Sequence, residues 1–369
     1  MKKVLSSLLI LFITIAVSIP ALAQDDMMLP DVIEIEQTGI IPEGIEWDEV
    51  GERFLVGSLT EGTIFQFDDM GAISPFIEDE DLVSTIGIHI DKTSGRLLVA
   101  NTDSNVFFNP DAANPFAGLA AYDLETGERQ FIVDMTDLYE SPAHFANDVV
   151  TDADGNAYVT NSIAPVIYKV TPDGEASIFL ENEAFAVEGL GLNGIEFHPD
   201  GYLLTAVMGS ASLYKISLDD PESLTLAETE MPYVIDGMAF DANYDLVVVA
   251  NVEDAQILAM LSSDDDWATV YEQSHVETDG NATTVAIRGN TTFYTKGYFN
   301  NPEQEVYDIT QVTLMTLMGM GDMEMDDMDG DDMGDGMDDD DMGDMDGDDM
   351  GDDDMDGDDM DDDDDDDDM

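Results

Sequence analysis

The sequence predicts an all-β fold, a six-bladed β-propeller with four-stranded blades, followed by a disordered acidic C-terminal tail. Three observations carry this prediction. A strand–turn–strand unit recurs six times, and each copy is followed by further short strand-like segments. The C-terminal residues 317–369 contain no aromatic side chain. Repeats of about 40 to 50 residues with four strands each are typical of propellers.

The repeated unit is clearest in the segment LNGIEFHPDGYLLTAV at residues 192–207. An Asn opens a strand of alternating apolar residues, and an Asp-Gly turn leads to a second strand. In register, the copies align these residues: Glu43, Ile86, Asn147, Asn193, Asp236 and Thr283. The intervals are 43, 61, 46, 43 and 47 residues, and the residue two positions further on is apolar in all six copies. This alternation predicts half-buried strands.

Residues 1–23 form a predicted signal peptide. Lys2 and Lys3 precede an apolar run, and Ala21-Leu22-Ala23 fits the rule for a cleavage site. We therefore expect a secreted or periplasmic protein with no membrane contact after cleavage, and the alternative is an uncleaved anchor. The propeller is expected at 24–316 and the Asp/Met/Gly-rich tail at 317–369.

Two segments outside the repeats have predicted places. The lone alternating strand at 31–37 would supply the missing outer strand of the last blade and so tie the ends of the ring together. The second unit carries an insertion at 105–118, which we expect to form a loop over one face of the ring.

The charge of the chain is strongly negative. Of the 85 acidic residues, 30 lie in 317–369, which leaves 55 in 24–316 against eight Lys and Arg (ten in all, less Lys2 and Lys3), a difference of 47. Nucleic acid is therefore not an expected partner. The tail is expected to be a solvated polyanion. A sharper alternative is weak capture of cations, with Asp oxygens for Ca2+ or Mg2+ and Met sulfur for Cu(I).

In a propeller, equivalent residues of the blades converge on the central channel. Four of the aligned residues offer side-chain oxygens: Glu43, Asn147, Asn193 and Asp236. Two carboxylates and two amides without Cys or His predict a site for a hard divalent cation, Ca2+ first, then Mg2+ or Mn2+. The alternative is that these residues only form turns at strand entries.

The placement of these four residues raises a geometric question. Strict alternation would put them on the same face as the apolar positions that follow, so we expect them where each strand begins, before regular pleating. Glycine follows four of the six aligned positions and is expected to let the backbone turn sharply near the axis.

The histidines are weaker candidates. His144, on the loop before Asn147, is either a second base or a solvent-facing residue. His89 lies within a predicted strand and is expected to be structural, and His198 lies in a turn and is expected to be exposed.

Four segments resemble motifs of the gluconolactonase, senescence-marker and luciferin-regenerating-enzyme family: PEGIEW at 42–47, ANDVVTDADG at 146–155, LNGIEFHPDG at 192–201 and IDGMAFDA at 235–242. The resemblance covers 41–295. It implies a six-bladed propeller with one divalent ion, usually Ca2+ or Zn2+, in the channel, and in many members hydrolysis of sugar lactones.

Residue roles follow from the same resemblance. It implies that Glu43, Asn193 and Asp236 hold the metal and that Asn147 faces the substrate and the ion. Lactonases of this family often carry an Arg two residues before that Asn. Phe145 stands there in this chain and indicates a more apolar substrate than a sugar acid.

The favoured hypothesis is therefore metal-dependent hydrolysis of a lactone or ester. Asp236, or a second carboxylate, would accept the proton of the attacking water, and Asn147 would stabilise the developing oxyanion. The alternative is a non-catalytic secreted propeller that binds a ligand or protein and holds a structural calcium ion. A third hypothesis makes the tail an extracellular cation buffer.

Overall fold

The computed structural model of the chain describes residues 29–111, 113–299, 301 and 303–314. The chain divides into two units, Met1–Met318 and Gly319–Met369, and all described residues belong to the first. The signal peptide predicted at 1–23 and the tail predicted at 317–369 lie outside the described residues.

The described residues form four four-stranded sheets and one eight-stranded sheet. Three sheets use consecutive strands: β2 (Pro42–Asp48), β3 (Arg53–Ser58), β4 (Thr63–Phe67), β5 (Ser74–Glu78); β6 (Ser84–Asp91), β7 (Arg96–Thr102), β8 (Ala117–Asp123), β9 (Arg129–Asp134); and β10 (Ala146–Thr151), β11 (Ala157–Asn161), β12 (Val166–Val170), β13 (Ala176–Glu181). Within each of these sheets the neighbouring strands pair antiparallel, as chain-adjacent hairpins do.

The eight-stranded sheet consists of two antiparallel halves. Their strands are β14 (Leu192–His198), β15 (Tyr202–Val207), β16 (Ser212–Ser217), β17 (Leu224–Thr229); and β18 (Val234–Phe240), β19 (Leu246–Val252), β20 (Ala255–Ser262), β21 (Thr269–Glu277). A short parallel pairing joins the outer strands of the halves, with Glu228 opposite Thr269 and Thr229 opposite Val270.

The remaining sheet joins the two ends of the described chain. Its order is β1-β24-β23-β22, with the following bounds: β1 (Val32–Glu36), β22 (Ala282–Arg288), β23 (Thr291–Lys296) and β24 (Val306–Val312). β1 pairs antiparallel with β24, with Ile33 opposite Ile309 and Ile35 opposite Tyr307. The prediction that 31–37 supplies the outer strand of the last sheet is therefore confirmed.

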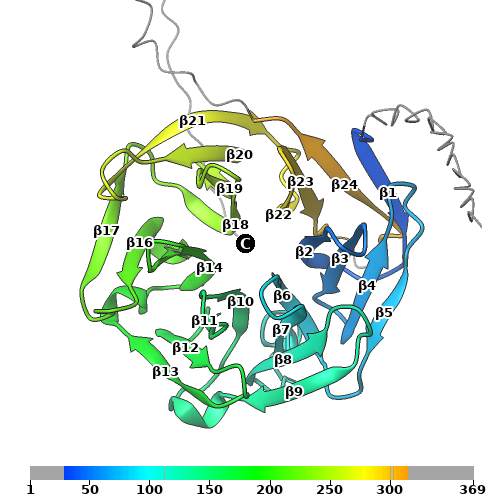
Figure 1. Cartoon of the computed structure of the whole chain (residues 1–369), viewed down its shortest axis with the longest axis horizontal. Helices are drawn as coiled ribbons and strands as arrows, with labels where there is room; N and C mark the ends of the chain where they lie inside the picture. The colour runs from blue at the N-terminus through cyan, green and yellow to red at the C-terminus, as the bar shows by residue number, and fades with distance from the viewer. Residues whose placement is uncertain (1–28, 112, 300, 302, 315–369) are drawn as a thin grey trace, which may run out of the picture. The chain divides into compact units, whose positions relative to one another are not determined.

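The innermost strands of the sheets form a closed cycle. Figure 1 shows them around the centre of the ring, with the other strands of each sheet farther out. Each contacts the next in this order: β2, β6, β10, β14, β18, β22 and back to β2. This is the arrangement of a β-propeller, and it brings residues far apart in sequence to one axis.

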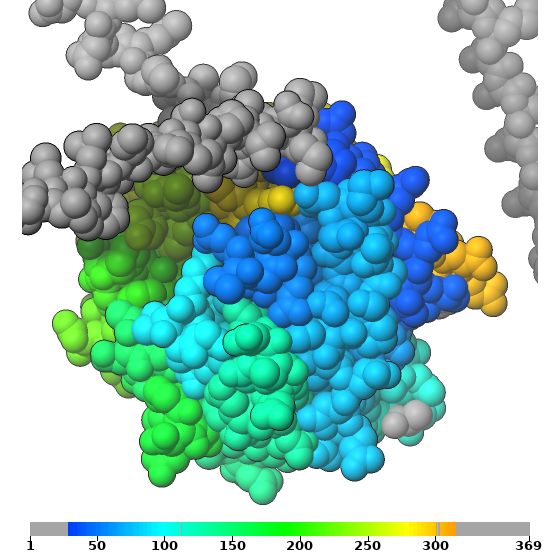
Figure 2. Space-filling view, turned by 45° about the vertical axis from the view of Figure 1, so that its right-hand side comes forward, coloured from blue at the N-terminus to red at the C-terminus, as the bar shows by residue number. Residues whose placement is uncertain are grey.

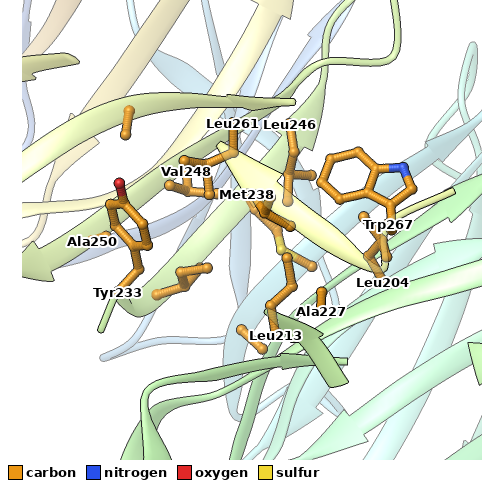
Figure 3. Close-up of a cluster of buried hydrophobic side chains, with 14 of the residues drawn as sticks. Leu204, Leu213, Ala227, Tyr233, Met238, Leu246, Val248, Ala250, Leu261 and Trp267 are labelled. Carbon is orange, nitrogen blue, oxygen red and sulfur yellow. The ribbon is translucent and has the colours of Figure 1, made fainter. Parts of the chain in front are cut away.

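Apolar side chains between neighbouring sheets form the core. In the cluster of Figure 3, Leu204 and Leu213 of one half of the eight-stranded sheet pack with Met238, Val248 and Leu246 of the other half. The space-filling view shows light blue atoms of β2–β5 directly against cyan and blue-green atoms of β6–β9 (Figure 2). The alternation seen in the sequence is thus used to bury one face of each strand against the next sheet.

Helix is confined to four short segments of the described chain: α1 (Asn105–Phe108), η1 (Thr136–Leu138), η2 (Glu183–Phe185) and η3 (Met208–Ser210). α1 lies in the insertion predicted at 105–118, between β7 and β8. Among the described helices, none has the length and apolar character needed to cross a membrane.

Basic side chains are scarce, and several lie at boundaries between sheets. The Arg96 guanidinium forms a buried ion pair with Asp91 (Nε–Oδ2 3.1 Å) and donates to the carbonyl oxygens of Gly155 (2.5 Å) and Pro172 (3.3 Å) in the next sheet. Arg53 pairs with Asp48 and donates to the Leu124 carbonyl oxygen in the same way (2.6 Å). These few cations therefore join hairpin turns of neighbouring sheets.

Candidate functional site

A cavity of about 360 Å³ lies where the inner strands meet, and residues of all six inner strands line it. Its volume falls within the range of small-molecule sites in proteins, about 300 to 1,000 Å³. Its lining combines carboxylates, amides and hydroxyls with apolar side chains. Because every inner strand contributes to this cavity, equivalent residues of the repeats can contact the same bound molecule there.

The aligned residues converge here as the repeat register predicts, with one exception. The oxygen ring, as we name Glu43, Asn147, Asn193 and Asp236, lines the cavity from four different inner strands, and so does Thr283. Ile86 is not among the residues that line the cavity. It is fully buried in an apolar cluster with Ile41, Leu59 and Phe145.

A β-bulge accounts for the orientation of the ring residues. In each inner strand the pairing with the next strand shifts register at the aligned residue: between Pro42 and Ile45, Thr85 and Ile88, Ala146 and Val149, Leu192 and Ile195, Ile235 and Met238, and Ala282 and Val285. The expectation that the aligned residues lie where each strand begins, before regular pleating, is confirmed, because each is the second or third residue of its strand and regular pairing resumes only after it. The extra residue of the bulge resets the alternation, so that the ring residues face the axis.

The glycines after the aligned residues have a different role from the one expected. A Cβ on Gly44 would lie 2.3 Å from the Ile86 carbonyl oxygen, and one on Gly194 would lie 2.7 Å from that of Asp236. Neither glycine is among the residues with positive φ. They therefore serve close approach of neighbouring inner strands and not a sharp turn.

Hydrogen bonds fix three members of the oxygen ring. Asn193 Nδ2 donates to Asp236 Oδ1 (2.9 Å), and Asn147 Nδ2 donates to Ser162 Oγ (2.9 Å). Ser162 Oγ in turn donates to the Leu192 carbonyl oxygen (2.7 Å), which ties β14 to the loop after β11. With the amide nitrogens of both Asn residues used as donors, their amide oxygens are left for another partner.

The fourth member of the oxygen ring, Glu43, differs from the other three. Its Oε2 atom is buried and has no hydrogen-bond partner. Burial raises the pKa of Glu43 well above its ordinary value, and the charges of Asp236 and Asp148 add to the rise. Burial likewise raises the pKa of Asp236 to about 7, against the lowering effect of the Asn193 hydrogen bond. Both carboxylates thus lack a compensating positive charge.

Acidic residues that the repeat register did not predict also line the cavity, among them the inner acidic group, as we name Glu46, Asp148 and Glu196. His89 lies beside this group. His89 Nδ1 lies 3.4 Å from Glu46 Oε1, and its Nε2 lies 3.1 Å from Thr151 Oγ1. His89, which was expected to be structural, thus also lines the central cavity.

Signals for these residues are present in the sequence. Glu46, His89 and Glu196 occupy the same place in their repeats, three residues after the aligned position and between two apolar residues. Asp148 stands where four other repeats have glycine. In a closed ring, the polar face of an inner strand points to the channel and not to bulk water.

The other two histidines of the sequence analysis lie outside this cavity lining. His144 is buried, with its Nδ1 3.1 Å from Asn161 Nδ2, and burial lowers its pKa. Its predicted exposure is wrong, and the same burial weakens the case for a second base. The His198 ring stacks on Tyr202 (centroids 4.5 Å apart) and is mostly covered, so the expectation of an exposed side chain is also wrong.

Comparisons with known proteins agree with this architecture. A family model described as SMP-30/Gluconolactonase/LRE-like region matches residues 41–294. No curated protein matches the chain at a significant level.

Several solved structures share the fold. The major allergen Mala s 1 of Malassezia sympodialis is similar at 17% identity, with 77% of this chain and 96% of that chain covered and a TM-score of 0.63. Luciferin-regenerating enzyme is similar at 16% identity, with coverage of 77% and 96% and a TM-score of 0.55. A gluconolactonase from Xanthomonas campestris is similar at 15% identity, with coverage of 77% and 91% and a TM-score of 0.51.

Proposed function

Because the chain belongs to the SMP-30/gluconolactonase/LRE-like family, we propose that it hydrolyses a lactone or ester with the help of a divalent cation in the central channel. Counting the halves of the eight-stranded sheet separately, we propose a propeller of six blades. We further propose that residues 1–23 act as a cleaved signal peptide, so that the activity would lie outside the cytoplasm.

The donor set of the oxygen ring supports a hard cation. Glu43, Asn193 and Asp236 would hold it, with Asn147 between the ion and the substrate. The buried and unpartnered Glu43 Oε2 is the observation that carries this assignment, because a buried carboxylate oxygen without a hydrogen-bond partner is stabilised by a cation. Within the described residues no three His, Asp or Glu side chains form a metal-binding group by themselves, so amide oxygens have to complete the set. All-oxygen donors favour Ca2+, ahead of Mg2+, Mn2+ and Zn2+.

The reaction is the addition of water to a carbonyl carbon. The water oxygen bonds to that carbon, the carbon–oxygen bond of the lactone or ester breaks, the alkoxide takes a proton and the acid product loses one. When bound, the cation supplies a Lewis acid for the carbonyl oxygen and a lowered pKa for water.

The protein groups have separate roles in this scheme. Asp236 accepts the proton of the attacking water as a general base. Asn147 donates one Nδ2 hydrogen to Ser162 Oγ, and its second Nδ2 hydrogen would be donated to the developing oxyanion. Because both residues are fixed before substrate arrives, little reorganisation accompanies the reaction.

Chelation tests the proposal. We expect hydrolysis of small lactones and aryl esters to stop in EDTA and to return with added Ca2+. Glu43→Gln should need more Ca2+ for recovery, whereas Glu49→Gln, an exposed acid beyond the end of β2, should recover as the wild type does. Turnover that is unaffected by EDTA would contradict a cation-dependent mechanism, and no turnover of any member of the panel would contradict the hydrolase assignment.

The raised pKa of Asp236 predicts a pH dependence of stability in the metal-free protein. The folded-state pKa of about 7 lies above the unfolded value of about 3.9, so Asp236 favours the folded state at low pH, and this contribution is lost as pH rises through about 7. In EDTA we expect Tm to fall between pH 5 and pH 8, and to fall less in Asp236→Asn. Added Ca2+ should remove the difference in slope, because the bound ion stabilises the ionised carboxylate. Equal slopes for wild type and Asp236→Asn in EDTA would show that this carboxylate is not perturbed as described.

A further inference from the structure

The cavity extends beyond the oxygen ring into an anionic region. Glu46 and Glu196 lie three residues further along β2 and β14 than the ring residues, roughly 10 Å along the strand. Asp148, on β10, acts on both groups, because its charge adds to the raised pKa of Glu196 and to those of Glu43 and Asp236. All three line the same cavity as Glu43 and Asp236, and Lys92 is its one Lys or Arg side chain. The cavity therefore has more negative groups than one divalent ion on the ring would neutralise.

Two carboxylates of the inner acidic group accept hydrogen bonds from the backbone. Asp148 accepts hydrogen bonds from the backbone N–H groups of Val149 (2.9 Å) and Ile195 (3.0 Å). Glu46 Oε1 accepts a long hydrogen bond from the Ile90 N–H (3.4 Å) and faces His89. Burial raises the pKa of Glu196 well above its ordinary value, and the charges of Asp148 and Glu46 add to the rise. Glu196 thus stands in a negative potential that its surroundings do not cancel.

Aromatic and apolar side chains complete the lining. Phe197, which follows Glu196 on β14, and Phe240 on β18 both line the cavity and are only partly buried. Phe240 is held edge-on against His198 (5.6 Å between centroids) and Trp267 (5.9 Å). Carboxylates next to aromatic faces are the surroundings in which an organic ammonium group is bound, by charge attraction and cation–π contact.

We propose that the substrate of this site carries a positively charged nitrogen, which lies between the inner acidic group and the rings of Phe197 and Phe240 while its ester or lactone carbonyl lies at the oxygen ring. This inference rests on the proposed hydrolase function. The lining also disfavours an anionic substrate and promotes release of the carboxylate product.

Matched esters test this inference. Acetylcholine and 3,3-dimethylbutyl acetate differ in one atom, the quaternary nitrogen against a quaternary carbon. In about 0.15 M NaCl, where contributions from distant surface charges are screened, we expect kcat/KM to favour acetylcholine by about tenfold or more. Glu196→Gln and, independently, Glu46→Gln should lower this ratio severalfold. Glu175→Gln, which removes the same charge from an exposed position outside the cavity lining, should leave the ratio and the activity unchanged.

The outcomes separate this inference from the proposed function. The inference of a cationic substrate would be overturned if both esters are hydrolysed with a kcat/KM ratio near one. It would also be overturned if the ratio is unchanged in both cavity variants and these variants are folded. Either result would leave the hydrolase assignment in place. If neither ester is hydrolysed, the proposed function fails for these esters, and calorimetric titration in CaCl2 with choline and its isostere 3,3-dimethylbutan-1-ol still decides the inference. Tighter binding of choline that is weakened by Glu196→Gln supports it, and equal binding of the two alcohols overturns it.

Discussion

Asp236→Ala is expected to lower kcat/KM for lactone or ester hydrolysis by about 10³-fold or more, because one substitution removes both a proposed cation ligand and the proposed proton acceptor. The carboxylate accepts the Asn193 amide hydrogen bond, so its loss also frees a second ring residue. Affinity for Ca2+ should fall together with activity. The measurement is steady-state hydrolysis at saturating Ca2+, with calcium binding to the same preparations.

Two further variants make this result interpretable. Asp236→Asn keeps the size of the side chain and removes the charge, and we expect it to lose activity to a similar extent. Asp220→Ala removes an exposed acid after β16, outside the cavity lining, and should retain wild-type activity. Folding of each variant is checked by circular dichroism and Tm. An Asp236→Ala protein that is folded and as active as the wild type would contradict the proposed mechanism.

The second large effect concerns stability. Arg96→Met is expected to lower the free energy of unfolding by about 3–5 kcal/mol, because it leaves the Asp91 carboxylate buried without its partner. Burial opposes ionisation of Asp91, but hydrogen bonds from Ser94 and the charge of Arg96 outweigh it and hold its pKa below the ordinary value. The substitution also removes the bonds to the Gly155 and Pro172 carbonyl oxygens that join two sheets. Urea denaturation at constant salt measures the change.

Arg129 provides the matched control. It pairs with Asp79 and Asp81, but its side chain is 39% exposed, so water and salt screen the interaction. Arg129→Met removes the same charge from the chain and should change stability much less than Arg96→Met. Equal effects of the two substitutions would indicate that loss of net positive charge, and not the buried ion pair, determines stability in this acidic protein.

Much of the fold was predictable because the repeats are explicit in the sequence. The apolar alternation after each aligned residue predicts the inner strands, and the isolated strand at 31–37 predicts the closure that β1 makes with β24. The parallel pairing of β17 with β21 was not predictable in the same way. It depends on how closely the outer edges of two neighbouring sheets approach, and no local pattern encodes that distance.

The candidate site was predictable in part, for a related reason. The register of the repeats alone predicts that four residues share one cavity, and all four line it: Glu43, Asn147, Asn193 and Asp236. The same register also aligns Ile86, but its side chain packs into an apolar cluster. The repeat register predicts only the position of the backbone, whereas packing determines which groups the side chain contacts. Alternation alone does not predict Glu196 as a site residue, because the polar side of a half-buried strand in an open sheet faces solvent. Ring closure turns that side into the wall of a channel.

A crystal soaked in Mn2+ and measured at the manganese absorption edge would show whether the oxygen ring holds a cation. We expect one strong anomalous peak in the channel, within about 2.5 Å of carboxylate oxygens of Glu43 and Asp236 and of the Asn193 amide oxygen. A channel without such a peak, or a peak that these three side chains do not contact, would contradict the claim that the oxygen ring holds a cation.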